Sequence, residues 1–462
     1  MEKRIERGNL TEGVIWKKLL LFFFPILFGM LFQQLYATAD AIIVGKFVGT
    51  DALAAVGGSA TQIINLVIGF FTGLASGATV IVSQYFGAKD DERVSLTVHT
   101  IITFYIIVGI ILAVLGYIFT PWALEAVKNP ADIMDLSVEY LRIYFIGALP
   151  MLIFNVGSGI LRAVGDSKRP LYFLITCCFI NIGLDLLFVA VFDYGVAGAG
   201  WATVISQTIS AILVTLNMCL TNGPHKLHFT KLKIDYYSLR DALWLGIPAG
   251  VQSSMYSVSN LIIQSAINGL GTTVIAAWSA VGKLDGLYWT TSSSFGAAIC
   301  AFVGQCFGAR KYGRMKKSVS TCMVIDLGTT MVISGLLLAL ARPGFSIISD
   351  DPEVIEYATE MLFYFAPYYI VWSFIEIISN TLRGAGDSVR PTIIIMLGVC
   401  LIRILWVMFV VPNWYTVKCI SLSYPVTWSI TAVALIIYYT CSGWLERVRG
   451  VPKGTVLTDA ED

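Results

Sequence analysis

The sequence has little charge for its length. Only 13% of its 462 residues are Asp, Glu, Lys or Arg, which is about half the ~25% that soluble domains carry. The 31 Lys and Arg nearly cancel the 30 Asp and Glu, so no overall basic field favours nucleic acid as a partner. With 56% hydrophobic residues, the chain cannot build a water-soluble surface or remain disordered.

Paired cysteines and common catalytic motifs are also missing. The nine cysteines are scattered and include no C-x-x-C, which excludes a disulfide framework or metal cluster of recognised spacing. The sequence contains no H-E-x-x-H and no P-loop. No Ser or Cys stands beside a base as an activated nucleophile would. We therefore predict that the protein is not an enzyme and needs no cofactor.

Long apolar blocks are what the sequence does contain. A helix needs roughly 20 apolar residues to cross a bilayer, and the blocks lack the short alternating strands of an outer-membrane barrel. They predict an all-α polytopic membrane protein with twelve transmembrane helices. The blocks cover residues 19–45, 52–84, 95–118, 137–162, 170–192, 196–220, 241–268, 273–307, 318–341, 355–382, 391–412 and 418–444.

Basic residues are distributed unevenly between the connecting segments. If both termini are cytoplasmic, the inner segments hold 24 Lys and Arg and the outer segments hold four, namely Lys46, Lys128, Arg342 and Lys418. Positively charged loops stay on the cytoplasmic side of a membrane. The pattern predicts a multi-pass protein of the plasma (inner) membrane with both termini cytoplasmic.

The chain is an internal duplication. The segment QYFGAK at 84–89 reappears as QCFGAR at 305–310, and LRAVGDSKRP at 161–170 reappears as LRGAGDSVRP at 382–391. Both pairs are 221 residues apart, so each half holds six predicted spans. Repeats of even span number have the same topology, which predicts two six-helix lobes related by a pseudo-twofold axis along the membrane normal.

These features divide the chain into five parts. We expect a cytoplasmic N-terminal segment at 1–18, an N-lobe at 19–220, a cytoplasmic linker at 221–240, a C-lobe at 241–445 and a cytoplasmic tail at 446–462.

In the repeated loops, the i,i+4 spacing predicts that Arg162 pairs with Asp166 and Arg383 with Asp387 as the helices end.

Two acidic residues lie inside predicted spans of the N-lobe. Asp40 precedes external Lys46 by six residues, and Asp185 precedes external Asp193 by eight, so both sit at a similar depth in the outer half of the membrane. Tyr36 and Asn181 stand one turn earlier on the same faces. Ionisable groups within spans are functional candidates, and these four predict a proton or cation site.

The C-lobe carries a different set of charges. Asp285 and Arg403 both fall near the midplane, where they form either a structural ion pair or part of a substrate site. Glu376 and Asp326 are expected near inner helix ends, from which they snorkel. Aromatic residues that face a cleft can hold flat or cationic organic molecules.

The combined motifs resemble the multidrug and toxic compound extrusion (MATE) family over nearly all of residues 10–445. The resemblance rests on QQLYATAD at 33–40 followed by Gly45, on the paired Q-x-F-G-A segments, and on the paired L-R-x-x-G-D-S-x-R-P loops. It implies twelve helices in two lobes and drug export driven by inward H⁺ or Na⁺.

The family's N-lobe cation site corresponds here to Asp40, Asp185 and Asn181, which could also hold Na⁺. Its probable neighbours by the same resemblance are Tyr36, Asn155, Tyr140 and Thr203. The sodium-coupled branch often has an acid in span seven, eight residues after the proline, and Tyr256 occupies that position here. This departure favours coupling through the N-lobe and leaves Tyr256 with Asp285 and Arg403 as a possible C-lobe substrate site.

The primary hypothesis is a secondary active multidrug antiporter. It would be a monomer in contact with membrane lipids that exports small amphiphilic organic cations in exchange for H⁺ or Na⁺ by alternating access. A flippase for a lipid-linked saccharide is the alternative within transport, although a more basic cleft would be expected for a pyrophosphate head. A membrane-embedded enzyme and a passive channel are the alternatives from other classes.

Overall fold

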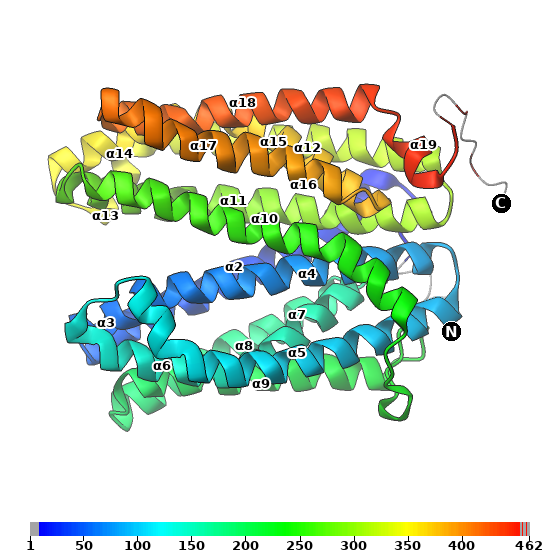
Figure 1. The fold of residues 1–462 in the computed structure, drawn as a ribbon, viewed down its shortest axis with the longest axis horizontal. Helices are drawn as coiled ribbons and strands as arrows, with labels where there is room; N and C mark the ends of the chain where they lie inside the picture. Colours follow the sequence, from blue (N-terminus) through cyan, green and yellow to red (C-terminus); the bar gives the residue numbers. More distant parts are fainter. Residues whose placement is uncertain (1–8, 453–454, 456–458, 460–462) are drawn as a thin grey trace. The chain divides into compact units, whose positions relative to one another are not determined.

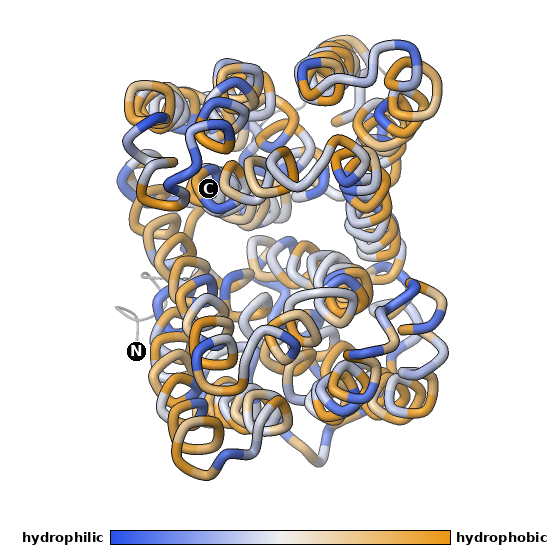
Figure 2. The backbone as a smooth tube through the Cα atoms, turned by 90° about the vertical axis from the view of Figure 1, so that its left-hand side faces the viewer, coloured by the Kyte–Doolittle hydropathy of each residue, from blue (hydrophilic) through white to orange (hydrophobic). Residues whose placement is uncertain are grey.

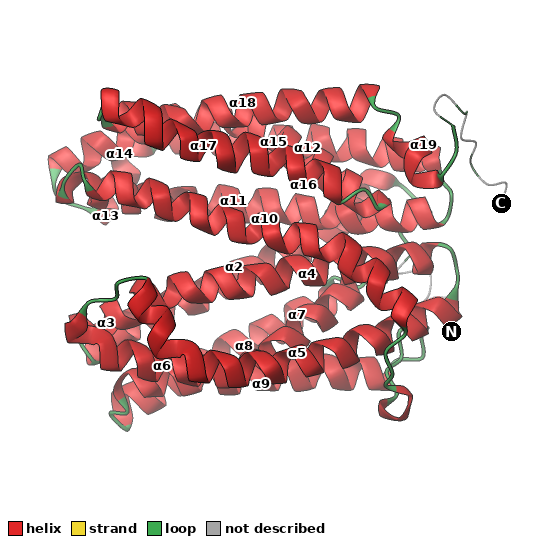
Figure 3. Cartoon of the chain, in the orientation of Figure 1, coloured by secondary structure: helices red, strands yellow, loops and turns green. Residues whose placement is uncertain are grey.

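The protein is mainly helical in the part of the chain that its computed structural model describes, residues 9–452, 455 and 459. Figure 3 shows helices joined by short loops, and no strand occurs among these residues. The expected N-terminal segment 1–18 lies outside the described residues as far as residue 8. The expected tail 446–462 lies outside them at 453–454, 456–458 and 460–462.

The chain forms two compact units, the first built mainly from Leu21–Gly250. Figure 1 draws its helices in blue to green. They are α2 (Ile15–Phe47), α3 (Thr50–Ala55), α4 (Thr61–Gly87), α5 (Asp91–Ala126), α6 (Met134–Ile146), α7 (Ala148–Ala163), α8 (Lys168–Asp185) and α9 (Gly195–Leu220). Wide π turns extend two of them, at Val56–Ala60 before α4 and at Leu186–Val191 after α8.

The second unit comprises Thr11–Leu20 and the chain from Val251 onward, so α2 and α10 each contribute to both units. Its helices are α10 (Tyr236–Asn268), α11 (Thr272–Gly308), α12 (Tyr312–Ala339), α13 (Ala341–Ile348), α14 (Pro352–Phe365), α15 (Tyr369–Ala385), α16 (Val389–Ile395), α17 (Ile402–Leu405), α18 (Val417–Cys441) and α19 (Trp444–Arg449). The π turns at Met396–Leu401 and Trp406–Val410 continue α16 and α17 into one long segment.

Each of the twelve predicted apolar blocks is helical. Nine helical segments in the described part of the chain are long and apolar enough to cross a membrane, and the α6–α7 pair, bent by 49°, makes a tenth. Helices α10 and α11 cover the remaining two blocks but are more polar, because they carry residues such as Gln252 and Asp285. The all-helical membrane fold is confirmed, and the number of twelve crossings stays a prediction.

The outward surface of α5 is apolar. Ile110, Ile111, Val114, Leu115 and Ile118 are each about half exposed, between 47% and 58%. A contiguous apolar surface of this kind is unstable in water and matches lipid. The hydrophobic colour follows the helices in Figure 2, and the hydrophilic stretches gather where the chain turns.

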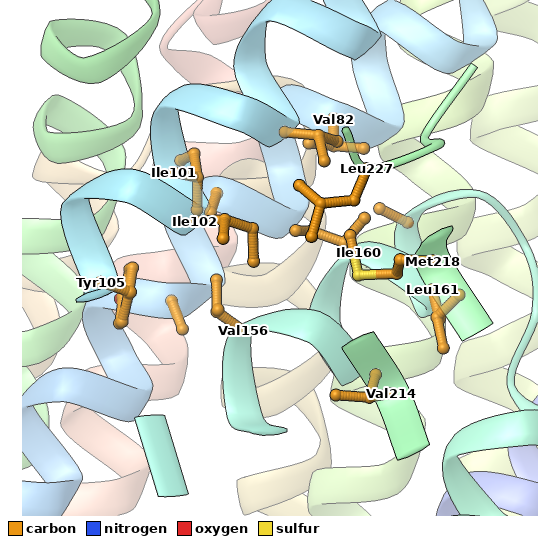
Figure 4. Packing of buried hydrophobic residues seen from close by; sticks show 14 of the residues in the cluster. Val82, Ile101, Ile102, Tyr105, Val156, Ile160, Leu161, Val214, Met218 and Leu227 are labelled. Atoms are coloured by element: carbon orange, nitrogen blue, oxygen red, sulfur yellow. The ribbon is translucent and has the colours of Figure 1, made fainter. Parts of the chain in front are cut away.

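The interior of the first unit is packed by side chains from α4, α5, α7 and α9. Figure 4 shows Val82, Ile101, Val156 and Val214 converging on one cluster. All four are fully buried or nearly so, with at most 1% of each side chain exposed. This core holds α7 in the middle of the unit and fixes the helices that carry its polar residues.

Glycines allow α4 and the first half of α10 to pack backbone to backbone. An added Cβ at Gly77 would lie 2.4 Å from the Ala242 carbonyl oxygen, and one at Gly246 would lie 2.4 Å from the Leu74 carbonyl oxygen. Such small-residue spacing lets membrane helices approach closely. The contact fixes the start of α10 within the first unit.

Gly77→Ala is expected to destabilise the protein by about 1–3 kcal/mol, because backbone atoms that cannot move aside would meet the new methyl group. Thermal unfolding in detergent measures the effect. Gly328→Ala is the matched control, because an added Cβ there meets nothing within 4 Å. Equal melting temperatures for the two variants would contradict the close contact.

The duplication is reproduced in backbone conformation. Lys89 (φ 57°) and Arg310 (φ 56°), which are 221 residues apart, are both left-handed, and so are Gly165 (φ 83°) and Gly386 (φ 104°). The same turn hydrogen bonds also recur: the Asp166 amide donates to the Leu161 carbonyl, and the Asp387 amide donates to the Leu382 carbonyl. The repeated motifs are therefore matching helix-to-helix corners.

The expected ion pairs in these corners are wrong. Asp166 pairs with Arg169 at 3.3 Å, and Asp387 pairs with Arg390 at 3.4 Å, instead of with Arg162 and Arg383. The chain turns before each Asp, so its carboxylate faces the start of the next helix. The Arg169 amide accordingly donates to Asp166 Oδ1 at 3.2 Å.

The basic loops of each unit meet at one end of that unit. In the first unit, the His228 amide donates to His99 Nε2 and the Asp235 amide donates to Thr100 Oγ1, joining the linker to the start of α5. In the second unit, the Arg314 guanidinium donates to the carbonyls of Glu12 and Gly13. The predicted cytoplasmic segments therefore share one end within each unit.

The linker histidine His225 gives a pH-dependent contribution to stability. Burial, aided by Arg169 and opposed by Asp166, lowers the pKa of His225 from 6.5 to about 4. This stabilisation is fully present above pH 6.5 and is lost as the pH falls toward 4, because the unfolded chain binds the proton first. At about 1.4 kcal/mol per pKa unit the loss approaches ~3 kcal/mol.

We expect the wild type to melt at lower temperature at pH 5 than at pH 7, and His225→Gln to lose much of this difference. Thermal unfolding at the two pH values tests the expectation. His228→Gln is the control, because His228 lies in the same linker without being buried. An unchanged pH dependence in His225→Gln would contradict it.

Candidate functional site

The first candidate site is a pair of buried carboxyl groups in the first unit, on α2 and α8. Asp185 is fully buried and Asp40 is 8% exposed. The two groups are close enough for direct electrostatic interaction. Asp185 is the last residue of α8 before the π turn Leu186–Val191, and such wide turns occur often at functional positions. We call this the paired-carboxyl site.

Two tyrosines border the paired carboxyls. Tyr140 of α6 interacts electrostatically with Asp40 and Asp185, and Tyr36 interacts with Asp40 from one turn earlier on α2. The Tyr36 hydroxyl accepts a hydrogen bond of 3.3 Å from the amide of Gln207 on α9. Helices α2, α6, α8 and α9 therefore meet at this site.

Polar atoms at the paired-carboxyl site lack partners. Several buried atoms have no hydrogen-bond partner: both carboxyl oxygens of Asp185, both amide atoms of Asn181, and Oδ1 of Asp40. Buried polar groups are normally hydrogen-bonded. A site with this many open acceptors on two acids can take up a proton or a small cation.

Two residues expected beside the carboxyls form no hydrogen bond with them. The Asn155 amide donates to the Met151 carbonyl on its own helix at 2.9 Å. Thr203 is buried on α9, one turn before Gln207. Their roles at the site stay predictions.

Gln207 is the member of this site that sequence reasoning missed. It is 4% exposed, donates to Tyr36, and leaves its own carbonyl oxygen Oε1 without a partner. The available signal was an amide inside an apolar span, four residues after Thr203 and so on the same face.

The second candidate site surrounds Asp285 in the second unit. Trp289 Nε1 donates to Asp285 Oδ2 at 3.0 Å, and Tyr369 Oη donates to the same oxygen at 3.1 Å. The rings of Tyr288 and Tyr369 stack at 4.0 Å. Around them lies an aromatic cluster whose six members are Tyr288, Trp289, Tyr369, Trp372, Tyr424 and Trp428.

Arg403 does not pair with Asp285, so the proposed ion pair is wrong. Its guanidinium lies over the Tyr424 ring at 3.9 Å and donates to Thr427 Oγ1 at 3.4 Å. A cation over an aromatic face is stabilised by the ring's electron density. The Tyr424 ring thus stabilises the guanidinium in place of a carboxylate. Tyr256 contacts the same region, with its ring 6.2 Å from that of Trp372.

No other constellation suggests metal chemistry. Within residues 9–452, 455 and 459, no group of three or more His, Cys, Asp or Glu side chains is placed to hold a metal ion. The cysteines of the same residues are all free.

Comparison with known proteins agrees with this class. The sequence model of the MatE family matches residues 25–187 and 248–408, once in each repeat. The probable multidrug resistance protein YoeA of Bacillus subtilis is 30% identical over 93% of this chain and 94% of its own length. An FAD transporter of Shewanella oneidensis is 22% identical over 98% of this chain and 100% of its own length.

The fold also matches a solved structure. The outward-facing structure of a multidrug resistance MATE family transporter aligns with a TM-score of 0.88 at 18% identity, covering 96% of this chain and 99% of the other. The apolar helices of a multi-pass membrane protein, together with the family model that matches both repeats, identify a membrane transporter. The chain belongs to the MATE family of secondary transporters, and the resemblance of its motifs is confirmed.

Proposed function

We propose that this protein exports amphiphilic organic cations from the cell in exchange for H⁺. The observation that carries the proposal is the pair Asp40 and Asp185, buried together without a cationic partner among the described residues. Two adjacent acids inside a membrane are costly when ionised. A stable fold tolerates the two acids most readily if one or both of them bind and release a proton.

Proton uptake changes the bonding of the paired-carboxyl site. An ionised Asp185 only accepts hydrogen bonds, whereas the protonated acid also donates one. Asn181 and Gln207 have open carbonyl oxygens that can accept this bond. Protonation from the outer side would thus tighten α8 against α9, and release of the proton inward would reverse the change.

The gradient supplies enough free energy for export. Exchange of one H⁺ for one monovalent organic cation moves no net charge, so the pH difference alone drives it. Each pH unit then contributes about 1.4 kcal/mol, which corresponds to roughly a tenfold concentration ratio. A second proton per substrate would move one net charge and would add about 2.3 kcal/mol per 100 mV of membrane potential.

The aromatic cluster suits a flat organic cation. Asp285 receives both of its hydrogen bonds on Oδ2, which leaves Oδ1 to face a positive group. Tryptophan and tyrosine rings bind cations and flat molecules through their faces. YoeA is named as a probable multidrug resistance protein, and that name supports the same class of substrate here.

We further propose a monomer in the plasma membrane with both termini cytoplasmic. The ratio of 24 inner to four outer basic residues supports this orientation, and so does the meeting of the basic loops at one end of each unit. The lipid-facing surface of α5 would contact the membrane lipids.

Reconstitution tests the proposal. Purified protein in proteoliposomes is given either a pH gradient or a Na⁺ gradient, and a fluorescent organic cation reports transport. We expect movement driven by the pH gradient. Movement driven only by Na⁺ would reassign the ion, equal flux without any gradient would indicate a channel, and transport of lipid-linked saccharide alone would indicate a flippase.

A further inference from the structure

The interior of the second unit contains an acid that neither candidate site uses. Asp326 is fully buried, neither of its oxygens has a hydrogen bond of good geometry, and the Ser373 hydroxyl on α15 is a nearby donor. It lies 14 residues after Tyr312, the first residue of α12, which places it about 21 Å along the helix. The expectation that Asp326 snorkels from a helix end is therefore wrong.

Asp326 begins a polar stripe on one face of α12. Thr330 and Ser334 follow at one-turn intervals and are both buried. Thr330 Oγ1 lies 3.1 Å from Ser373 Oγ on α15, and the Ser334 hydroxyl donates to the Ala366 carbonyl oxygen at 2.5 Å. The stripe thus faces α15 and the turn before it.

Among the residues that the structure describes, no positively charged group faces Asp326. Tyr288 of α11 and Glu376 of α15 interact with it electrostatically, and Cys322 precedes it by one turn on α12. Arg383 acts on Glu376 and does not act on Asp326. Hydroxyl groups and a second acid therefore surround a carboxyl that has no counter-charge.

The equivalent position of the first repeat shows that packing does not require an acid here. Tyr105 lies 221 residues before Asp326, is equally buried, and donates its hydroxyl to the Phe71 carbonyl oxygen at 3.2 Å. The first unit thus fills the position with a satisfied polar group. The second unit fills it with a carboxyl group that has a poorly placed hydroxyl donor and no counter-charge among the described residues, an arrangement that packing alone does not require.

We propose that Asp326 is a proton-binding site within the second unit, in addition to the paired-carboxyl site. This inference rests on the proposed H⁺-driven export. A protonated Asp326 needs no counter-charge and can donate to a hydroxyl such as that of Ser373, whereas the ionised form can only accept from it. The proton comes from water and returns to water, and each exchange reverses the hydrogen bond between α12 and α15.

An equilibrium measurement on the full-length protein tests the site without any transport. The protein is placed in lipid nanodiscs, and the infrared carbonyl band of protonated carboxyl groups is followed through a pH titration. We expect Asp326→Asn to remove one titrating group per chain from this band. Gly328→Ala, which changes no carboxyl group and adds a Cβ that meets nothing within 4 Å on the same helix, is expected to leave the band unchanged.

A second variant keeps the test decisive if Asp326→Asn does not fold. Ser373→Ala removes a hydroxyl near the carboxyl and is expected to shift the titration midpoint of one group without removing it. An unaltered band in both variants would overturn the proposal, and so would Na⁺ binding that depends on Asp326 at constant pH. In proteoliposomes, Asp326→Asn is expected to move about one proton fewer per substrate.

The experiments distinguish a failure of the proposed function from a failure of the Asp326 site. If Asp326 titrates but a pH gradient drives no export, the proposed function is wrong and the proton site remains. If export is H⁺-driven and Asp326 does not titrate, only the second-unit site is wrong.

Discussion

Asp185→Asn is expected to reduce pH-gradient-driven export by at least about tenfold, the kinetic equivalent of ~1.4 kcal/mol. The substitution preserves side-chain shape but removes the group that exchanges the proton. Asp40→Asn should have the same effect, because the two acids interact. The measurement is the initial rate at which a fluorescent cation enters proteoliposomes that hold the protein in the inside-out orientation, under an imposed pH gradient.

Asp193→Asn is the matched control for this experiment. Asp193 is an exposed acid in the segment that follows Asp185, and its left-handed backbone (φ 54°) suits Asn equally well. The control should transport at the wild-type rate. Normal, still pH-dependent transport by both Asp40→Asn and Asp185→Asn would remove the basis of the proposed coupling.

Asp285→Asn is expected to weaken the binding of cationic substrates by about tenfold to a hundredfold, or ~1.4–2.8 kcal/mol. The amide oxygen can still accept from Trp289 and Tyr369, so the local hydrogen bonds survive while the negative charge is lost. Fluorescence titration of purified protein with matched cationic and neutral ligands measures the change.

The neutral ligand makes this test specific. Its affinity should change little in Asp285→Asn, because stacking on the aromatic cluster remains. Glu356→Gln, which alters an exposed acid, should leave both affinities unchanged. An equal loss for the two ligands would mean that Asp285 only maintains the structure, and no loss for either would place the substrate elsewhere.

The helices and their duplication could be predicted from the sequence because both depend on local patterns. Twenty apolar residues in succession form a helix wherever they occur in a membrane. The corners at Gly165 and Gly386 repeat because a left-handed residue is needed at each turn. Asp40 and Asp185 were predicted to lie at a similar depth, because both helices run outward and the acids precede the outer segments by six and eight residues. The family resemblance then placed both acids in one site.

Partners across helices could not be predicted in the same way. Spacing along a helix shows which residues share a face, but it does not show which neighbour that face meets. An ion pair with Asp285 was one of two alternatives for Arg403, but its guanidinium contacts the Tyr424 ring, and hydropathy does not distinguish these partners. Gln207 was missed for the same reason, because its hydrogen bond to Tyr36 spans 171 residues of chain.

The two left-handed basic residues, Lys89 and Arg310, have a consequence for how the chain enters the membrane. A glycine would adopt this conformation freely, whereas a residue with a Cβ loses about 1 kcal/mol. Each follows the last turn of a helix, where positive charge is favourable. At both positions the fold is thus slightly less stable than it would be with glycine, but a positive charge is kept, and such a charge opposes transfer of the loop across the membrane. Each half would then carry its own orientation signal during synthesis and would insert correctly without instruction from the other.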